Sequence, residues 1–179
     1  MARWPFSRKE PDYEPKSREA LPLPPLGQRL TRTGSAIPEG LDQAMVRAVV
    51  EDFYYKARRD PVVGPVFNRV IEEEEWPHHL DKITAFWSSM LLGTGTYQGR
   101  PMPKHINIGE LADPHFARWL ALFRETVETL CPPHVAAIFV ERAERIGNNF
   151  RYGITTAEGR DPRDLVYMRA GLPPKDEPG

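Results

Sequence analysis

Residues 113–130 read DPHFARWLALFRETVETL and carry the clearest amphipathic pattern in this chain of 179 residues. Large apolar side chains recur there at intervals of three and four residues, which is the spacing of one face of an α-helix. They are Phe116, Trp119, Leu120, Phe123, Val127 and Leu130. Asp113 suits a helix cap and Pro114 suits the first helical position. The sequence therefore predicts a helix with one buried face.

Three further segments without internal proline show helical spacing, at about residues 41–59, 76–92 and 132–151. Prolines lie between these segments or in their first turns, where a helix tolerates them. The acidic run 72–75 precedes the second segment, and negative charge is favourable before a helix N-terminus. No alternating strand pattern competes, so we expect an all-α fold.

The two ends of the chain differ from its centre in composition. Eleven of the 19 prolines fall in residues 1–40 and 152–179, among charged and small polar residues without an apolar period. Such segments bury too little apolar surface to fold by themselves. We expect one globular domain at residues 41–151, with flexible tails at 1–40 and 152–179.

Composition also argues against several kinds of partner and location. With 24 basic and 25 acidic side chains, the chain has no net field that would attract nucleic acid. Cys131 is the only cysteine, so no internal disulfide can form, as is usual in a reducing compartment. No signal-peptide pattern or membrane-spanning window of ~18 apolar residues is present. We expect a cytoplasmic protein without membrane insertion or a nucleic-acid partner.

Residues 93–109 are rich in glycine and proline and separate the second and third predicted helices. An irregular segment of this length inside a compact domain generally has a function or is ordered by a ligand. It contains His105, which becomes a candidate ligand. His115 and His134 lie in first helical turns, where exposure is expected.

His78 and His79 are adjacent, so they point about 100° apart on a helix and only one can join its apolar face. His79 has the spacing that matches Ile83 and Phe86. Zinc needs three or four converging ligands, and the scattered histidines and single cysteine show no such spacing. This argues against a metal site built from protein ligands alone.

Helical periodicity alone does not decide between two interpretations of the polar groups on His79, Tyr54 and Trp119. In the first, His79 is an ordinary boundary residue, and Tyr54 and Trp119 are core aromatics with buried polar tips. In the second, these side chains from three helices surround a flat apolar cofactor, with His105 as its ligand.

Several motifs occur in a fixed order over about residues 41–151. They are FY (53–54) with DPVVGPVFN (60–68), WPHHLDKITAFW (76–87), MLLG (90–93), YQGRPMPKH (97–105) and FARWLALF (116–123). In this combination they resemble the group III truncated haemoglobins. The double-glycine motifs of the other truncated groups are absent, which fits group III. The resemblance implies a truncated globin, a two-over-two helical sandwich around one haem b.

The resemblance also implies roles for individual residues, carried over by position. His105 would be the proximal ligand to the haem iron, and Tyr54, His79 and Trp119 would form the distal pocket where chemistry takes place. The further haem contacts would be Phe67, Ile83, Phe86 and Trp87.

The implied function is binding of O2, NO, CO or peroxide at a five-coordinate iron. Hydrogen bonds from Tyr54 and Trp119 would slow the release of O2, which opposes bulk transport. Slow release favours redox chemistry with NO or peroxide, as in an NO dioxygenase or a peroxidase-like enzyme. A reductase would be a partner for such chemistry. The alternatives are a gas or redox sensor globin and a cofactor-free helical interaction module.

Overall fold

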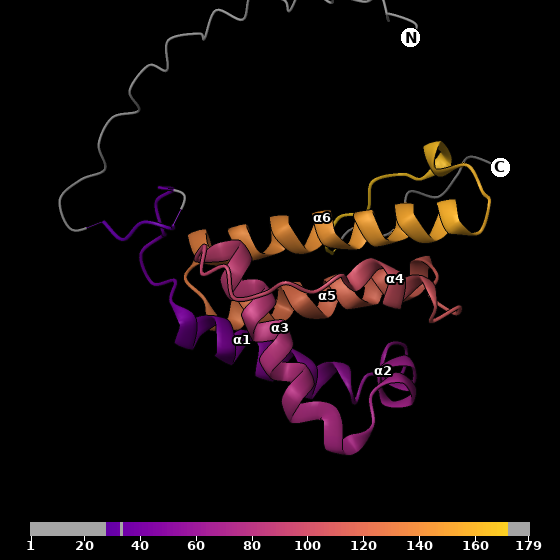
Figure 1. Ribbon diagram of the computed structural model, residues 1–179, viewed down its shortest axis with the longest axis horizontal. Coiled ribbons are helices and arrows are strands. Elements are labelled where there is room, and N and C mark those ends of the chain that lie inside the picture. The colour runs from indigo at the N-terminus through magenta and orange to yellow at the C-terminus, as the bar shows by residue number, and fades with distance from the viewer. Residues whose placement is uncertain (1–27, 33, 172–179) are drawn as a thin grey trace, which may run out of the picture.

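The computed structural model describes residues 28–32 and 34–171 (Figure 1). Its helices are α1 Gln43–Ala57, α2 Gly64–Val70, η1 Glu73–Glu75, α3 Trp76–Leu91, α4 Pro101–Ile106, α5 Asp113–Leu130, α6 Pro133–Ala157 and η2 Pro162–Asp164. The described residues form no sheet, only one isolated bridge between Leu30 and Ala36. None of the helices in this part of the chain is long and apolar enough to cross a membrane.

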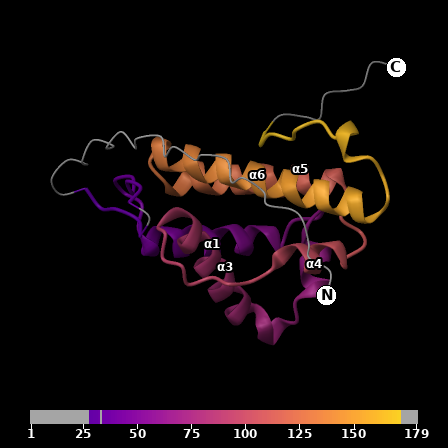
Figure 2. The same cartoon turned by 45° about the horizontal axis from the view of Figure 1, so that its top comes forward.

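The α-helices form two layers, with α1 and α3 in one and α5 and α6 in the other (Figure 2). α1 packs against α3 within its layer and against α5 across the layers, while α5 packs along α6. The short helix α4 packs on α6. The predicted all-α, two-over-two arrangement is confirmed.

Prolines mark where the helices begin. Each α-helix from α2 to α6 has a proline in its first turn, where a missing backbone N–H costs no helical hydrogen bond. α1 starts differently, because the Asp42 side chain accepts a 2.8 Å hydrogen bond from the Met45 amide. The prolines that divide the sequence therefore also start its helices.

Asp113 does not cap α5 as the sequence suggested. The N-cap is Ala112, and Asp113 is already the first helical residue. Its carboxylate instead accepts two 2.7 Å hydrogen bonds from the buried guanidinium of Arg151 in α6. This ion pair ties the start of α5 to the C-terminal half of α6.

The centre of the core is a group of aromatic rings from α1, α3 and α5. Phe123 stacks on Trp87 at 4.9 Å and on Trp119 at 5.6 Å, with nearly parallel planes in both pairs. Phe53 meets Phe123 edge-on at 5.3 Å. Such ring pairs add to the free energy of simple apolar burial, so this group fixes the two layers against each other.

The C-terminal part of the domain extends beyond the expected boundary. Residue 151 lies inside α6, which continues to Ala157. The chain then turns back along the helices (Figure 1), and Met168 and Ala170 are buried. Asn148 of α6 holds the Met168 backbone through two 2.8 Å hydrogen bonds. The segment expected as a tail is thus packed on the domain as far as Ala170.

The N-terminal part of the domain also begins before its expected start. Leu41 is fully buried, and Ile37 packs against the core. The Arg29 side chain donates a hydrogen bond to the Leu41 carbonyl. Residues 1–27 of the expected N-terminal tail lie outside the described residues.

Candidate functional site

Tyr54 lies on the buried face of α1. Only 8% of its surface is exposed, and this burial raises the pKa of the phenol well above its ordinary value. The hydroxyl therefore keeps its proton near neutral pH. The Tyr54 ring stands edge-on to the rings of Phe67 and His79, at 5.4 Å from each. Tyr54 thus brings a hydrogen-bond donor to the place where α1, α2 and α3 meet.

His79 of α3 turns its ring toward Tyr54, and its Nε2 is buried without a hydrogen-bond partner in the described part of the chain. Burial lowers the pKa of the imidazole to about 4, and the positive charges of Lys82 and Lys104 act in the same direction. The ring is therefore neutral at physiological pH. Its buried nitrogen can still bond to a ligand.

Trp119 reaches this region from α5. Its indole is half-buried, stacks on Phe123 and meets Phe53 edge-on at 5.9 Å. Phe53 in turn touches the Tyr54 ring at 5.0 Å. Trp119 therefore joins the Tyr54 and His79 group through Phe53, and its ring plane is fixed by the aromatic core.

His105 lies in α4, a helix of six residues within the segment that was expected to be irregular. Its Nδ1 is 2.9 Å from the carbonyl oxygen of Pro101. Because a carbonyl only accepts, Nδ1 carries the proton and Nε2 keeps its lone pair. Burial lowers the pKa of this imidazole, against the opposing effect of the Pro101 hydrogen bond. His105 is thus a neutral imidazole with a defined tautomer.

The imidazole of His105 has no set of protein co-ligands. The described residues hold no group of three or more His, Cys, Asp or Glu side chains arranged around a metal ion.

The four predicted cofactor contacts occupy two different environments. Phe67 of α2 and Ile83 and Phe86 of α3 are half-buried, so each has surface left for a further apolar contact. Trp87 is only 3% exposed and packs on Phe86 as well as in the aromatic core. Trp87 therefore has less free surface than the other three and contacts Phe86 directly.

Two aromatic residues near the site were not predicted from the sequence. Trp76 at the start of α3 contacts the rings of Tyr54 and His79 at 5.8 and 5.6 Å. Phe150 of α6 stacks on the imidazole of His105 at 3.9 Å. Helical periodicity places both residues on apolar faces, but it cannot show which ring each one meets.

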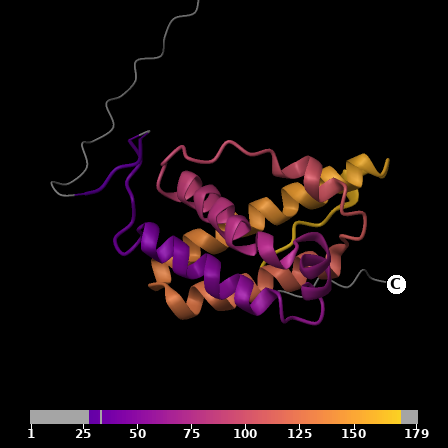
Figure 3. The ribbon, with the colours of Figure 1, turned by 60° about the horizontal axis from the view of Figure 1, so that its bottom comes forward.

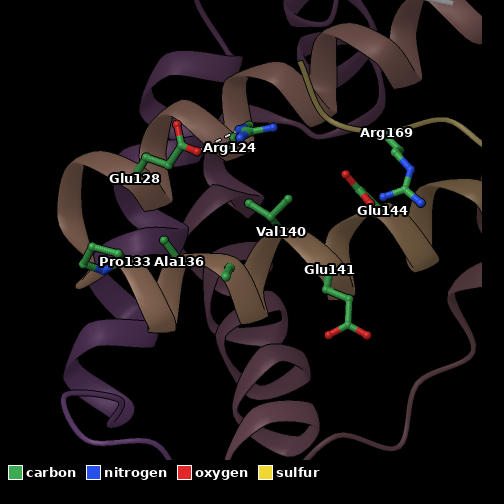
Figure 4. A pocket seen from close by; sticks show the side chains of 9 residues that line it. Arg124, Glu128, Pro133, Ala136, Val140, Glu141, Glu144 and Arg169 are labelled. Atoms are coloured by element: carbon green, nitrogen blue, oxygen red, sulfur yellow. Dashed lines mark hydrogen bonds and ion pairs between the residues drawn. The ribbon is translucent and has the colours of Figure 1, made fainter. Parts of the chain in front are cut away.

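A hollow of about 510 Å³ lies elsewhere on the molecule (Figure 4). It is bordered by Arg124, Glu128, Pro133, Ala136, Ala137, Val140, Glu141, Glu144 and Arg169. These residues belong to α5, α6 and the returning C-terminal segment, and they include no predicted site residue. This hollow is therefore separate from the region of His79 and His105.

Comparisons with known proteins agree with this architecture. The family model described as bacterial-like globin matches residues 39–146. A curated group 3 truncated haemoglobin from Campylobacter jejuni is 36% identical over 115 residues, which cover 63% of this chain and 91% of that protein.

A solved structure gives the same result. The crystal structure of a group III truncated haemoglobin from Campylobacter jejuni superimposes with a TM-score of 0.60 at 35% identity, covering 64% of this chain and 91% of that one. The resemblance found in the sequence motifs is confirmed. The chain belongs to the bacterial-like globins and, within them, to the group III truncated haemoglobins, which makes it a haem-binding globin for small gaseous ligands.

Proposed function

We propose that this globin holds haem b through a bond from His105 Nε2 to the iron, with Tyr54, His79 and Trp119 around the gaseous ligand. The tautomer of His105 is the observation that carries the proposal. The Nδ1 proton is donated to the Pro101 carbonyl, so the lone pair of Nε2 is available. A neutral imidazole held by a backbone carbonyl is the usual form of a metal-bound histidine.

Two further features fit this cofactor. The buried Nε2 of His79 has no partner among the described residues, and an unmet buried polar group costs about 1–3 kcal/mol. A ligand that bonds to this nitrogen would remove the cost. The half-buried side chains of Phe67, Ile83 and Phe86 offer apolar surface that a flat macrocycle can cover.

When bound, haem supplies an iron that takes O2, NO or CO and exchanges single electrons. The Tyr54 hydroxyl and the Trp119 indole N–H are the donors that would bond to the ligand. If each bond contributes about 1.5 kcal/mol, ligand release slows by roughly a hundredfold. Slow release is poorly suited to bulk O2 transport and better suited to converting NO to nitrate or to activating peroxide.

Substitution of the proposed ligand tests the cofactor assignment. We expect the parent protein to contain one haem b per chain, identified by the pyridine haemochrome spectrum, and His105→Ala to lose it. His78→Ala is the matched control, because His78 is exposed on α3. Full haem content in His105→Ala would contradict the proposal.

The redox role has its own test. We expect the O2-loaded ferrous protein to convert added NO to nitrate stoichiometrically, with visible spectra recorded alongside nitrate analysis. The same protein should release O2 slowly when NO is absent. Fast release without nitrate formation would instead indicate a carrier.

A further inference from the structure

The helix that carries His105 is too short to be stable alone. α4 has six residues and no side-chain hydrogen bond at its N-cap. Isolated helices of this length do not persist in water, because too few hydrogen bonds offset the cost of starting a helix. Its position must therefore come from packing, and α6 is the helix on which it packs (Figure 3).

Two side-chain contacts join α4 to α6. His105 stacks on Phe150 with ring centroids 3.9 Å apart and planes 13° from parallel. Met102 lies against Gly153, where a Cβ atom would overlap the Met102 sulfur and lie 2.9 Å from its methyl carbon. Met102 and His105 are three residues apart on α4, and Phe150 and Gly153 are three residues apart on α6. The two contacting residues of each helix therefore lie on one face of it. As residue numbers rise along α4 they fall along α6, so the helices run antiparallel at this contact.

The two contacts constrain His105 in complementary ways. The hydrogen bond from Nδ1 to the Pro101 carbonyl fixes one edge of the imidazole but leaves the ring free to tilt about that bond. The flat face of Phe150 removes this tilt, because a stacked ring has a preferred plane. Together they fix the direction of the Nε2 lone pair.

Gly153 has a separate part in this arrangement. Glycine inside a helix is less favourable than alanine, since it loses more backbone entropy. Gly153 lies in α6 one turn before its C-terminal end, and the space of its missing side chain is taken by Met102. The glycine therefore leaves room for the Met102 side chain, which packs α4 onto α6.

We propose that Phe150 and Gly153 of α6 are positioning residues for His105: Phe150 sets the plane of the imidazole, and Gly153 provides the space in which Met102 packs α4 onto α6. The proposal rests on the proposed function, in which His105 Nε2 binds the haem iron. Neither α6 residue bonds to the iron. Each acts through the orientation of His105.

Four variants of the haem-loaded, full-length protein test this proposal. Phe150→Leu keeps an apolar side chain but removes the flat face, and Phe150→Tyr restores that face. Gly153→Leu introduces a good helix former that must displace Met102. Tyr152→Leu is the control, because Tyr152 is a mostly exposed aromatic residue of the same helix.

The main readout is the iron–histidine stretching band in the resonance Raman spectrum of the ferrous protein. We expect Phe150→Leu and Gly153→Leu to shift or broaden this band, and to speed amide hydrogen exchange in α4. Since an aromatic pair contributes modestly, transfer of haem to an acceptor globin should become about two- to tenfold faster in Phe150→Leu. Phe150→Tyr and Tyr152→Leu should match the parent protein.

Several results would overturn the proposal. An unchanged band in Phe150→Leu, even with lower thermal stability, would make Phe150 an ordinary packing residue. If Phe150→Leu does not fold, an unchanged band in Gly153→Leu would decide against the proposal. His105→Ala separates this proposal from the proposed function. If His105→Ala keeps its haem, His105 is not the iron ligand and the proposed function fails. If His105→Ala loses its haem but the iron–histidine band of Phe150→Leu is unchanged, only the positioning role is refuted.

Discussion

At the residue level, the three polar side chains of the proposed ligand site offer different hydrogen bonds. Tyr54 is held protonated by its burial, so its hydroxyl donates near neutral pH. The indole of Trp119 can only donate, whereas the neutral imidazole of His79 donates or accepts according to its tautomer. Tyr54 and Trp119 are therefore the donors whose removal should affect ligand release most simply.

We predict that Tyr54→Phe speeds O2 dissociation about tenfold or more, because it removes a hydroxyl donor while nearly keeping the ring volume. Trp119→Phe should act in the same direction. The two effects should not simply add, since donors around one ligand form a coupled network. Stopped-flow release of O2 from both single variants and the double variant measures this. Unchanged release in both single variants would make these side chains structural core alone.

The sequence predicts which residues are candidates for the site, but it does not predict which side chains they contact. Tyr54, His79 and His105 are predicted from their motifs, and the structure brings the rings of Tyr54 and His79 into contact. The stacking of Phe150 on His105 was not found, because it joins residues on separate helices that no local spacing relates. Trp87 was expected to line the cavity, and the structure adds that it is buried and stacks on Phe123 in the aromatic core.

At the level of elements, Asp60 links the short helix α2 to α5. One carboxylate oxygen accepts hydrogen bonds from the Val62 and Val63 amides, and the other accepts a 2.7 Å bond from Arg118. The Asp60 side chain is only 2% exposed. Its burial raises the pKa, but the bonds from Arg118, Val63 and Val62 outweigh this and lower it below the ordinary 3.8.

This arrangement predicts a pH dependence of stability. A carboxyl whose pKa is lower in the folded state stabilises the fold above its unfolded pKa, and the contribution is lost as pH falls through the folded pKa. We expect Asp60→Asn to lower the free energy of unfolding at pH 7 by about 1.5–3 kcal/mol, the range for hydrogen bonds to charged groups. The difference from the parent should shrink below about pH 4, near the ordinary carboxyl pKa.

Urea unfolding at a series of pH values measures this difference. Asp164→Asn is the control, because Asp164 is exposed in η2. A loss of stability in Asp60→Asn that stays constant down to the lowest pH would show that the Asp60 charge is not its cause.

Helix length explains which elements the sequence could predict. α1, α3, α5 and α6 have 15 to 25 residues, enough for an apolar face to repeat several times. α2 and α4 have seven and six residues and start with Gly-Pro and Pro, so no period could develop. Their positions depend on packing against longer helices, which a local pattern does not record.

At the level of the whole molecule, the returning C-terminal segment holds the second layer together. Beyond the Asn148 contacts, the Ala170 backbone accepts a 2.8 Å bond from Arg124 of α5 and donates one to Glu144 of α6. The Val166 carbonyl accepts another from Arg151. The sequence suggested a dispensable tail here, because the short apolar run 165–168 stands among charged residues and shows no helical period.

Two truncations test the role of this segment. Removal of residues 172–179 should leave stability and haem content unchanged. Removal of residues 158–179 should lower the free energy of unfolding by about 3 kcal/mol, since it exposes the site of Met168 and breaks several hydrogen bonds. Urea unfolding and haem content are measured for both. Equal stability of the two truncated chains would show that the packed segment contributes nothing.

The most direct test of the account is chemical rescue of the proposed iron ligand. His105→Gly removes the imidazole and leaves a space beside Phe150 that free imidazole can enter. We predict that this variant is purified without stable haem, and that added imidazole restores haem binding with a spectrum like that of the parent protein. Stable, parent-like haem binding by His105→Gly without imidazole would contradict the account.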